Sequence, residues 1–267
     1  METFLSQILG TITLRPYFAA FFVAYFLACS LHLGVKRALL FAVAGYIIAW
    51  ASEYSSIHNG IPYGHYYYTR QTMGRELWLF GVPSMDSMSF VLLSYASYSA
   101  ALLALSPVVR GVGYLPEDKK IRHSLTARLL GALFCMYLDV LIDPLALRGD
   151  KWFLGQIYGY AGNGVYFGIP ISNFAGWFVV GFLLIYALQL IDRLLAPGKA
   201  KDFVPPAWSQ LLGPALYLSI IIFNLSVALL IREDGLLCSS ILILLLPSVL
   251  FVSLVRTRRR GRLQYIE

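Results

Sequence analysis

The sequence predicts an all-α, polytopic membrane helix bundle with about seven transmembrane helices. Hydrophobic residues make up 58% of the 267 residues and charged residues only 13%, whereas about a quarter of an ordinary soluble domain is charged. Apolar segments near the roughly 20 residues needed to cross a bilayer recur along the chain, at positions 17–34, 38–53, 86–106, 125–147, 173–192, 210–231 and 237–255. We therefore expect residues 1–267 to form a single integral membrane domain.

The second segment is short and runs into Glu53 and the polar stretch YSSIHNG before it ends. Residues 77–83 are also apolar, but a segment of this length suits an interfacial or re-entrant piece. Counts of six and eight spans therefore stay open beside the count of seven.

The distribution of Lys and Arg predicts the orientation of the bundle, because cytoplasmic loops are enriched in these residues. With seven spans, the amino-terminus and the loops after spans two, four and six share one side. That side holds six of the 21 basic residues, and the other side holds fifteen. The sequence therefore places the amino-terminus outside and the carboxyl-terminus in the cytoplasm; in a bacterial cell the membrane would be the inner one.

The basic tail, residues 256–267, begins with five arginines among seven residues, RTRRRGR. Such a run attracts phosphate, whether in nucleic acid or in anionic lipid. Because it directly follows a final apolar segment, we expect it to anchor that helix to lipid headgroups. The formal net charge of +7 then reflects topology, and we expect membrane lipids and no nucleic acid as partners.

No cleavable signal peptide is expected, because METFLSQILGTITLRP lacks a basic start, a continuous apolar core and a small-residue cleavage site. The three cysteines, Cys29, Cys135 and Cys238, fit no metal-ligand or disulfide spacing. We expect three free thiols packed within the spans.

Two carboxylates lie four residues apart near the end of the fourth apolar segment, Asp139 and Asp143 in YLDVLIDP. On a helix this spacing puts both on one face, and an acid within a membrane span is a functional-site candidate by default. Asp139 has the stronger case, because several apolar residues separate it from the polar loop. Pro144 disfavours a regular helix next to Asp143, which could therefore mark only a kink or a stop.

The two loops on the non-cytoplasmic side, which we expect to be structured, are rich in Gly, Tyr and Trp and resemble each other. Each follows an acid at the end of an apolar helix, Glu53 or the Asp139 and Asp143 pair, and each ends in Gly-x-Pro-x-x-[Asp/Asn], at Asp86 or Asn173. The spacings from Glu53 to Asp86 and from Asp139 to Asn173 are 33 and 34 residues. This pattern suggests a degenerate helix-loop-helix repeat in parallel orientation, with Asp86 and Asn173 as helix N-caps. With or without a repeat, these five residues are expected to converge near the non-cytoplasmic surface.

Simpler roles for the loop residues stay open. Glu53 and Asp86 could be interfacial caps, and a loop histidine such as His58 or His65 is more often a plain hydrogen-bonding residue than a metal ligand. An aromatic belt at the membrane interface would equally explain Tyr66, Tyr67, Tyr68, Trp152, Tyr158 and Tyr160.

The strings GIPYGHYYYT, GVP, YLDVLIDP and YFGIPISNFAGW together resemble a membrane carotenoid-biosynthesis family. This family contains the carotenoid 1,2-hydratases, of the gamma-carotene 1'-hydroxylase and bisanhydrobacterioruberin hydratase types. The resemblance covers about positions 45–190 and implies hydration of a terminal isoprenoid double bond in an acyclic carotenoid end group. Carried over to the matching positions, it implicates Glu53, Tyr63, Tyr66, Tyr68, Asp139, Asp143, Asn173 and Trp177.

One stretch departs from this resemblance. After Gly81-Val82-Pro83 an apolar helix start with an aromatic residue such as Trp is expected, but the chain has SMDSMSF. This extra polarity leaves open a substrate that is another isoprenoid.

The implied reaction begins with protonation of the less substituted alkene carbon and ends with capture of the tertiary carbocation by water. Burial disfavours the charged form of a carboxyl group, and two neighbouring carboxyl groups do not both ionise easily, so one can stay protonated. We assign Asp139 as the general acid, with Asp143 or Glu53 as the partner that orients or deprotonates the water. Substrate binding and stabilisation of the cation by aromatic faces are assigned to Tyr63, Tyr66, Tyr68, Asp86, Trp152, Asn173 and Trp177.

Hydration needs no cofactor, and we expect neither a cofactor nor a metal. The chain has no dinucleotide-binding Gly-x-Gly-x-x-Gly after a strand, no Walker loop, no redox cysteine pair and no Asp-Asp-x-x-Asp pattern for magnesium diphosphate.

Three other classes of function stay open. A metal-dependent oxygenase needs several histidines near the carboxylates, and of His32, His58, His65 and His123 the first and last lie toward the cytoplasm. A proton-coupled transporter would share intramembrane acids and a helix repeat, although these acids lie toward one face instead of the midplane. A non-catalytic isoprenoid-binding protein would share every feature. The sequence does not predict an oligomeric state.

Overall fold

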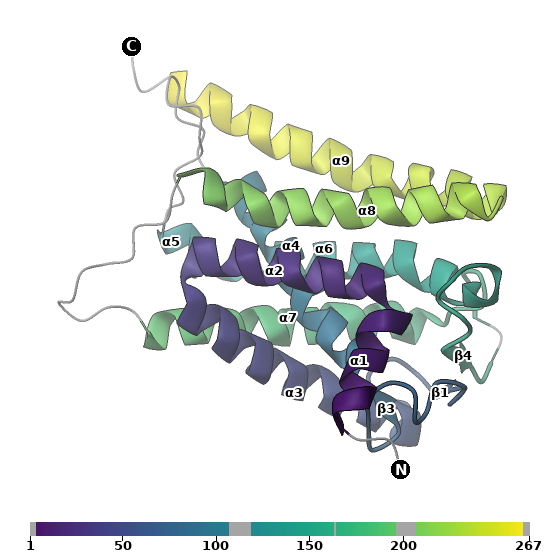
Figure 1. Ribbon diagram of the computed structural model, residues 1–267. Helices are drawn as coiled ribbons and strands as arrows, with labels where there is room; N and C mark the ends of the chain where they lie inside the picture. Colours follow the sequence, from purple (N-terminus) through teal and green to yellow (C-terminus); the bar gives the residue numbers. More distant parts are fainter. Residues whose placement is uncertain (1–3, 107–118, 163, 196–206, 264–267) are drawn as a thin grey trace.

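Helices dominate the part of the chain that the computed structural model describes, residues 4–106, 119–162, 164–195 and 207–263 (Figure 1). The predicted all-α bundle is thereby confirmed. In chain order, the described elements are α1 (Phe4–Leu14), α2 (Pro16–Leu33), α3 (Val35–Asn59), β1 (Tyr66–Tyr68), β2 (Trp78–Leu79), β3 (Val82–Pro83), α4 (Ser84–Leu105), α5 (Lys119–Arg122), α6 (Leu125–Ala146), the 3-10 helix η1 (Gly149–Lys151), β4 (Tyr158–Tyr160), α7 (Ile171–Leu194), the 3-10 helix η2 (Ala207–Leu211), α8 (Leu212–Leu230) and α9 (Asp234–Leu263).

Seven of the described helical segments are long and apolar enough to cross a membrane, which confirms the predicted number of spans. They are α2, α3, α4, α6, α7, Trp208–Leu230 and Asp234–Ser253. The protein is therefore a multi-pass membrane protein. Helix α1 is an additional apolar helix that we did not predict, because its 11 residues are too few to span a bilayer.

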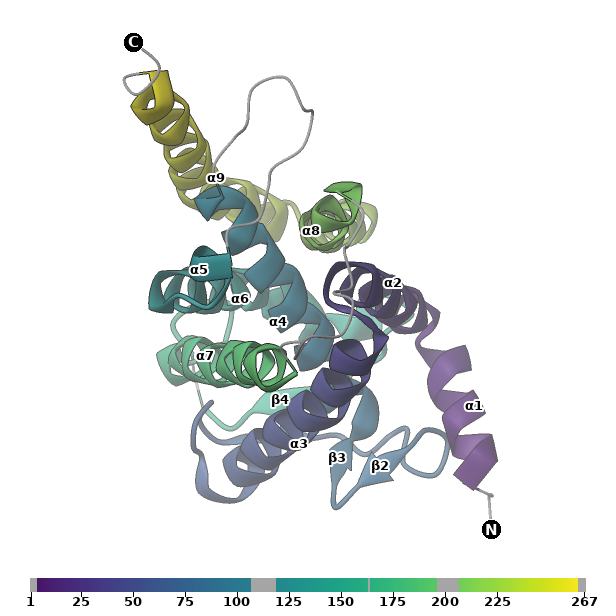
Figure 2. The ribbon, with the colours of Figure 1, turned by 90° about the vertical axis from the view of Figure 1, so that its left-hand side faces the viewer.

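Helix α4 occupies the centre of the bundle, with the other long helices around it (Figure 2). Of its membrane-crossing window, 83% is buried, against 17% for the peripheral α9. A small residue permits this close packing on one side. A Cβ atom at Gly131 of α6 would lie 2.7 Å from the Ile185 side chain on α7 and 3.2 Å from the Tyr98 Cα on α4. Small residues at such contacts let membrane helices approach each other closely.

The two ends of the bundle differ in structure (Figure 1). The strands lie at one end, which we call the loop end, and α5 and the turn between α2 and α3 lie at the other, which we call the Asp192 end after its central acid. That turn is the single residue Gly34, whose φ of 100° glycine adopts readily. Helix α1 is at the loop end and the last turns of α9 are at the opposite end, as an odd number of spans requires.

A small antiparallel sheet joins the two long loops that we expected to be structured. Strands β1 and β4 pair with Tyr66 opposite Tyr160 and Tyr68 opposite Tyr158. The apolar residues 77–83, expected as an interfacial or re-entrant piece, form the hairpin β2–β3. It turns at Phe80 and Gly81, both with positive φ.

Helix α3 is longer than predicted, which corrects the position of Glu53. The helix continues to Asn59 and ends at Gly60 in the left-handed conformation, so Glu53 lies inside the helix instead of at its end. One of the polar residues that suggested an end instead contacts the following loop. The buried hydroxyl of Ser56 accepts a hydrogen bond from the backbone N–H of Tyr63, at 2.9 Å.

The prediction that Asp86 and Asn173 are helix N-caps is wrong. Helices α4 and α7 begin two residues earlier, at Ser84 and Ile171, and the N-cap positions hold Pro83 and Pro170. Both polar residues are therefore the third residue of a helix. Their side chains line the interior of the bundle instead of capping the helix ends.

Pro144 does not end α6 at Asp143. The helix continues to Ala146, and the N–H of Leu147 bonds to the Asp143 carbonyl at 3.0 Å. A proline this close to the end of a helix removes one backbone hydrogen bond without stopping the last turn.

The cysteines are free thiols as predicted, and Cys29 and Cys135 are buried, but Cys238 is exposed on α9. Helix α9 extends through the start of the basic tail to Leu263. The remaining tail residues, and the basic residues Arg110, Lys199 and Lys201 that entered the orientation count, lie outside the described residues.

Candidate functional site

A cavity of about 170 Å³ lies at the loop end of the bundle, between α2, α3, α4, α6, α7 and α8. It is comparable in size to a cavity of about 150 Å³ that binds benzene, so it has room for one end of a long hydrocarbon and not for a whole polyene. All ten candidate site residues predicted from the sequence line it: Glu53, Tyr63, Tyr66, Tyr68, Asp86, Asp139, Asp143, Trp152, Asn173 and Trp177.

Asn173 joins the two carboxyl groups of α6. Its Nδ2 donates to Asp139 Oδ2 at 2.7 Å and to Asp143 Oδ2 at 2.9 Å. The helical spacing of the acids puts them on one face, and the first turn of α7 brings the amide between them. All three side chains are only 2% exposed.

Tyr158 and Tyr160 of β4 complete the surroundings of Asp143. The Tyr160 hydroxyl donates to Asp143 Oδ2 at 2.6 Å, and the Tyr158 hydroxyl donates to Oδ1. Burial, and then the charge of Asp143, raise the pKa of both hydroxyl groups well above its usual value, so they stay donors. The sequence left an interfacial belt open as the role of both tyrosines. The alternation YGY puts them on one face of a strand and could have indicated a shared target.

Glu53 of α3 is held from two other elements. The Tyr68 hydroxyl on β1 donates to Glu53 Oε1 at 2.8 Å, and the Ser87 hydroxyl on α4 donates to Oε2. Burial, followed by the charge of Glu53, raises the pKa of Tyr68 well above its usual value. Ser87 belongs to the polar stretch SMDSMSF, but its contact with Glu53 was not predicted.

The apolar side of the cavity is largely aromatic. The rings of Phe90 on α4 and Trp177 on α7 stack with centroids 4.0 Å apart and an interplanar angle of 8°. Tyr63 packs against both rings, and its hydroxyl pairs with Ser52 at 2.9 Å. A cation inside the cavity would therefore meet the faces or edges of several π systems.

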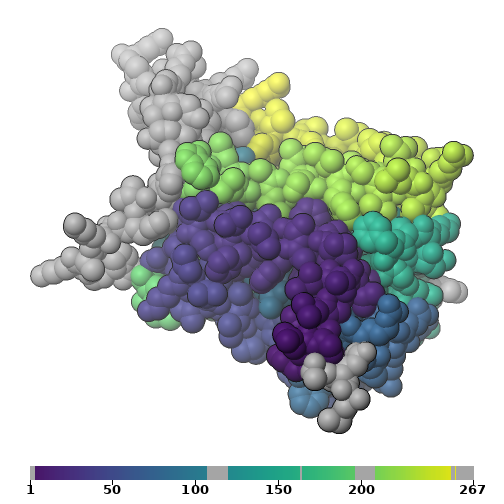
Figure 3. All heavy atoms as spheres, in the orientation of Figure 1, coloured from purple at the N-terminus to yellow at the C-terminus, as the bar shows by residue number. Residues whose placement is uncertain are grey.

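Helices α2 and α8, which lie side by side (Figure 3), form a wall of the cavity that sequence reasoning missed. Tyr17 of α2 stacks on Phe223 of α8 with centroids 5.4 Å apart, and Phe21 meets the same ring edge-on. Nothing in their local pattern distinguishes these residues from lipid-facing ones, because only the packing of distant helices brings them to the site.

No Lys or Arg is among the described residues that line the cavity, although it holds four acids. A cation lies close behind them. Arg15, at the junction of α1 and α2, forms a buried ion pair with Glu76 at 3.3 Å and donates to the Leu154 carbonyl. Asp86 lies within electrostatic range of this pair, and its Oδ2 is buried with no hydrogen-bond partner among the described residues.

The histidines do not gather around the acids. His32 bonds to Tyr95 and His123 to Asp192, both at the Asp192 end, while His58 and His65 are exposed. Among the described residues, no group of three or more His, Cys, Asp or Glu side chains is placed to hold a metal ion.

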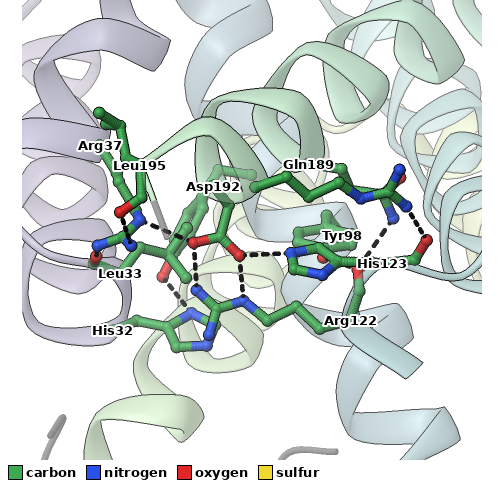
Figure 4. A network of polar contacts seen from close by, with 11 residues as sticks. His32, Leu33, Arg37, Tyr98, Arg122, His123, Gln189, Asp192 and Leu195 are labelled. Carbon is green, nitrogen blue, oxygen red and sulfur yellow. Dashed lines mark hydrogen bonds and ion pairs between the residues drawn. The ribbon is translucent and has the colours of Figure 1, made fainter. Parts of the chain in front are cut away.

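The Asp192 end carries a different polar cluster, drawn in Figure 4. Asp192 of α7 contacts Arg37 Nε at 2.8 Å, Arg122 Nε at 2.9 Å and His123 Nε2 at 2.7 Å. Arg37 also donates to the backbone carbonyls of Leu33 and Leu195. This cluster ties α2, α3, α5 and α7 together.

Comparison with known proteins adds one finding. A protein-family model described as "carotenoid biosynthesis protein" matches residues 6–248. No curated protein and no solved structure matches the chain.

Proposed function

Because the chain belongs to the carotenoid biosynthesis protein family, we propose that it is a hydratase. It adds water to a terminal isoprenoid C=C bond, of the C-1,2 type, in an acyclic carotenoid end group. Its own side chains supply the acid and base, and it needs no cofactor. The observation that carries this proposal is the cavity at the loop end, where paired carboxyl groups face an aromatic wall.

The size and lining of the cavity favour an end group as the reacting part. About 170 Å³ accommodates the branched terminus of an isoprenoid chain, while the long polyene extends among the helices and the lipid. Tyr63, Phe90 and Trp177 supply the π faces that stabilise a tertiary carbocation.

Hydrogen-bonding capacity supports Asp139 as the proton donor. A carboxylate only accepts hydrogen bonds, whereas a protonated carboxyl group also donates one. Asp143 accepts from three donors, Tyr158, Tyr160 and Asn173, a pattern that suits a carboxylate. Asp139 accepts a single bond, on Oδ2, which leaves Oδ1 to carry a proton into the cavity.

The Asp192 end supports an enzyme over a transporter. Alternating access needs both ends of the bundle to open around one site. At the Asp192 end, however, four helical elements are tied by Asp192, Arg37 and Arg122. The four acids of the cavity lie toward the other end.

The orientation of the chain is part of this proposal. The excess of Lys and Arg in the sequence segments on the side of the Asp192 end supports a cytoplasmic location for that end and for the carboxyl-terminus. The loop end, with the proposed site, then faces the opposite side of the membrane.

The test is to express the protein in a host that makes the acyclic carotenoid lycopene and to look by mass spectrometry for a gain of water. Asp139→Asn should lower product formation by about 100-fold or more, the scale of general acid catalysis, with a normal level of protein in the membrane. Asp150→Asn, an exposed acid at the same end, is the matched control and should hydrate normally. Absence of hydrated product from wild type with several acyclic carotenoids would favour the isoprenoid-binding alternative. Normal turnover by Asp139→Asn would show that Asp139 is not the general acid.

A further inference from the structure

Hydration needs a second substrate, water, and the cavity must hold it next to the cationic carbon. This inference rests on the proposed function and concerns which side chain performs that task. We expected Asp143 or Glu53 to be the partner of Asp139 that binds this water. The carboxyl groups of both are already occupied by hydrogen bonds. Asp143 accepts three hydrogen bonds, and each oxygen of Glu53 already accepts one.

Asp86 is the acid in the cavity with a buried oxygen that no described residue satisfies. It is the third residue of α4, and its Oδ2 is buried without a hydrogen-bond partner. The Tyr68 hydroxyl, which donates to Glu53 at 2.8 Å, also lies within bonding reach of the Asp86 carboxyl group. The nearby Ser89 hydroxyl donates to the Asp86 backbone carbonyl at 2.6 Å, so it does not serve the carboxyl group.

A second polar feature lies on the same side of the cavity. Arg15 and Glu76 are 2% and 1% exposed, and Arg15 Nε and Glu76 Oε2 both lack hydrogen-bond partners among the described residues. Both side chains are within electrostatic range of Asp86. Buried polar atoms without protein partners are typically satisfied by bound water. This side of the cavity therefore suits water, whereas the aromatic side suits hydrocarbon.

We propose that Asp86 binds the attacking water and accepts its proton. Asp139 transfers its proton to the less substituted alkene carbon, which forms the new C–H bond, breaks the π bond and leaves the cation on the tertiary carbon. The water oxygen bonds to that carbon while one of its protons passes to the Asp86 carboxylate. Asp86 gains the proton that Asp139 has lost, and transfer between the two groups through water restores the resting state.

Deuterium oxide separates the two steps of this reaction. In D₂O the carboxyl group of Asp139 carries a deuteron, so the less substituted carbon of the cation holds both the delivered deuteron and its original proton. When no water captures the cation, rotation about the neighbouring single bond lets the ionised Asp139 remove the original proton instead. The alkene then re-forms with deuterium, so an enzyme without the water-binding base still exchanges hydrogen on this carbon. The experiment incubates isolated membranes with unlabelled lycopene in D₂O and measures both hydrated product and deuterium in the recovered, unhydrated lycopene.

For Asp86→Asn we expect hydration to fall by about 100-fold or more while deuterium still enters unhydrated lycopene. Asp86→Glu, which keeps a carboxylate, should restore part of the hydration. Asp139→Asn should lose hydration and exchange together, and the control Asp150→Asn should keep both. If Asp86→Asn does not accumulate in the membrane, Asp86→Ser gives the same comparison.

Two outcomes would overturn the assignment. Hydration by Asp86→Asn at the wild-type rate would show that another group binds the water. Loss of both hydration and exchange, with normal protein in the membrane, would place Asp86 in protonation or substrate binding. Failure of the proposed function itself looks different, because wild type would then neither hydrate nor exchange any acyclic carotenoid.

Discussion

Both ends of this bundle hold buried acids, but the acids of the cavity and Asp192 have opposite surroundings. At the Asp192 end, one carboxylate contacts Arg37, Arg122 and His123. At the loop end, four acids line one cavity whose described lining includes no Lys or Arg. Their hydrogen bonds come instead from tyrosines, a serine and an asparagine.

These surroundings distinguish an acid that holds helices together from an acid that can exchange a proton. An ion pair with several cations keeps a carboxylate ionised and fixes the helices that carry it. An acid served only by neutral donors keeps the capacity to hold or release a proton. In a membrane protein, where buried ionisable groups are costly, the second arrangement needs a functional reason, and hydration chemistry supplies one.

We expect the largest effect from a cation introduced into the cavity, whose described lining has none. Asn173→Lys places an ammonium group between Asp139 and Asp143, where it would pair with both as carboxylates and remove the proton donor. We expect hydration of lycopene to fall by about 100-fold or more, measured per amount of protein in the membrane. Ile171→Lys, at an exposed position in the same helical turn, should retain activity; full activity of Asn173→Lys would contradict a neutral proton donor there.

A second variant removes the carboxylate that balances the arginines at the Asp192 end. Asp192→Asn leaves Arg37 and Arg122 without their carboxylate, and loss of one partner of a buried ion pair costs about 3 kcal/mol. We expect a lower melting temperature in detergent, with hydration per folded protein close to wild type. An unchanged melting temperature would mean that Asp192 does not hold this end together.

A smaller effect is expected from the aromatic side of the cavity. Trp177→Leu removes the ring that stacks on Phe90 at 4.0 Å and with it one π face for the cation, an interaction of about 1–2 kcal/mol. Hydration should fall by about 10-fold, with a larger change in kcat than in KM because the cation exists only during the reaction. A change confined to KM would assign Trp177 to substrate binding alone.

The smallest effect concerns an exposed ion-pair cluster outside the site. Bonding from Lys151, followed by Arg148, holds the pKa of Glu233 below its ordinary value. A lowered pKa means that this stabilisation is complete above the ordinary glutamate pKa of about 4.3 and is lost as the pH falls through the lowered value. We expect Glu233→Gln to lower the melting temperature slightly at neutral pH, because surface pairs contribute little.

The melting temperatures of wild type and Glu233→Gln should converge in acid, and high salt at neutral pH should also bring them together. A difference that persists in acid would point to packing instead of charge.

Much of the fold could be predicted because the hydropathy of a contiguous segment is enough to indicate a membrane-spanning helix. Runs of about 20 apolar residues indicated seven spans, and the described part of the chain has seven helices long and apolar enough to be spans. Helix ends were less predictable. YSSIHNG suggested an end near Glu53, yet the helix continues and the Ser56 hydroxyl accepts a hydrogen bond from the loop residue Tyr63. Asp86 and Asn173 were expected as N-caps, but Pro83 and Pro170 occupy those positions.

The acids themselves stood out for the same local reason. Asp139 and Asp143 are conspicuous in an apolar segment, and the Tyr and Gly content of the two loops marked them as more than linkers. The partners of the acids were harder to select. Tyr158 and Tyr160 lie on β4, which pairs with β1 in the small sheet near Asp143. Phe223 lines the cavity because α8 packs beside α2.

The sequence alone determined that this protein is a seven-span membrane bundle and which carboxyl groups are unusual in it, since hydropathy and charge depend on local composition. Only the tertiary structure decided which acids have cations and which have neutral donors. Arg37 and Asp192, or Tyr160 and Asp143, meet through the packing of helices and loops. The partner decides whether an acid suits holding helices together or donating a proton, because the groups within hydrogen-bonding distance of a carboxyl group determine its protonation state.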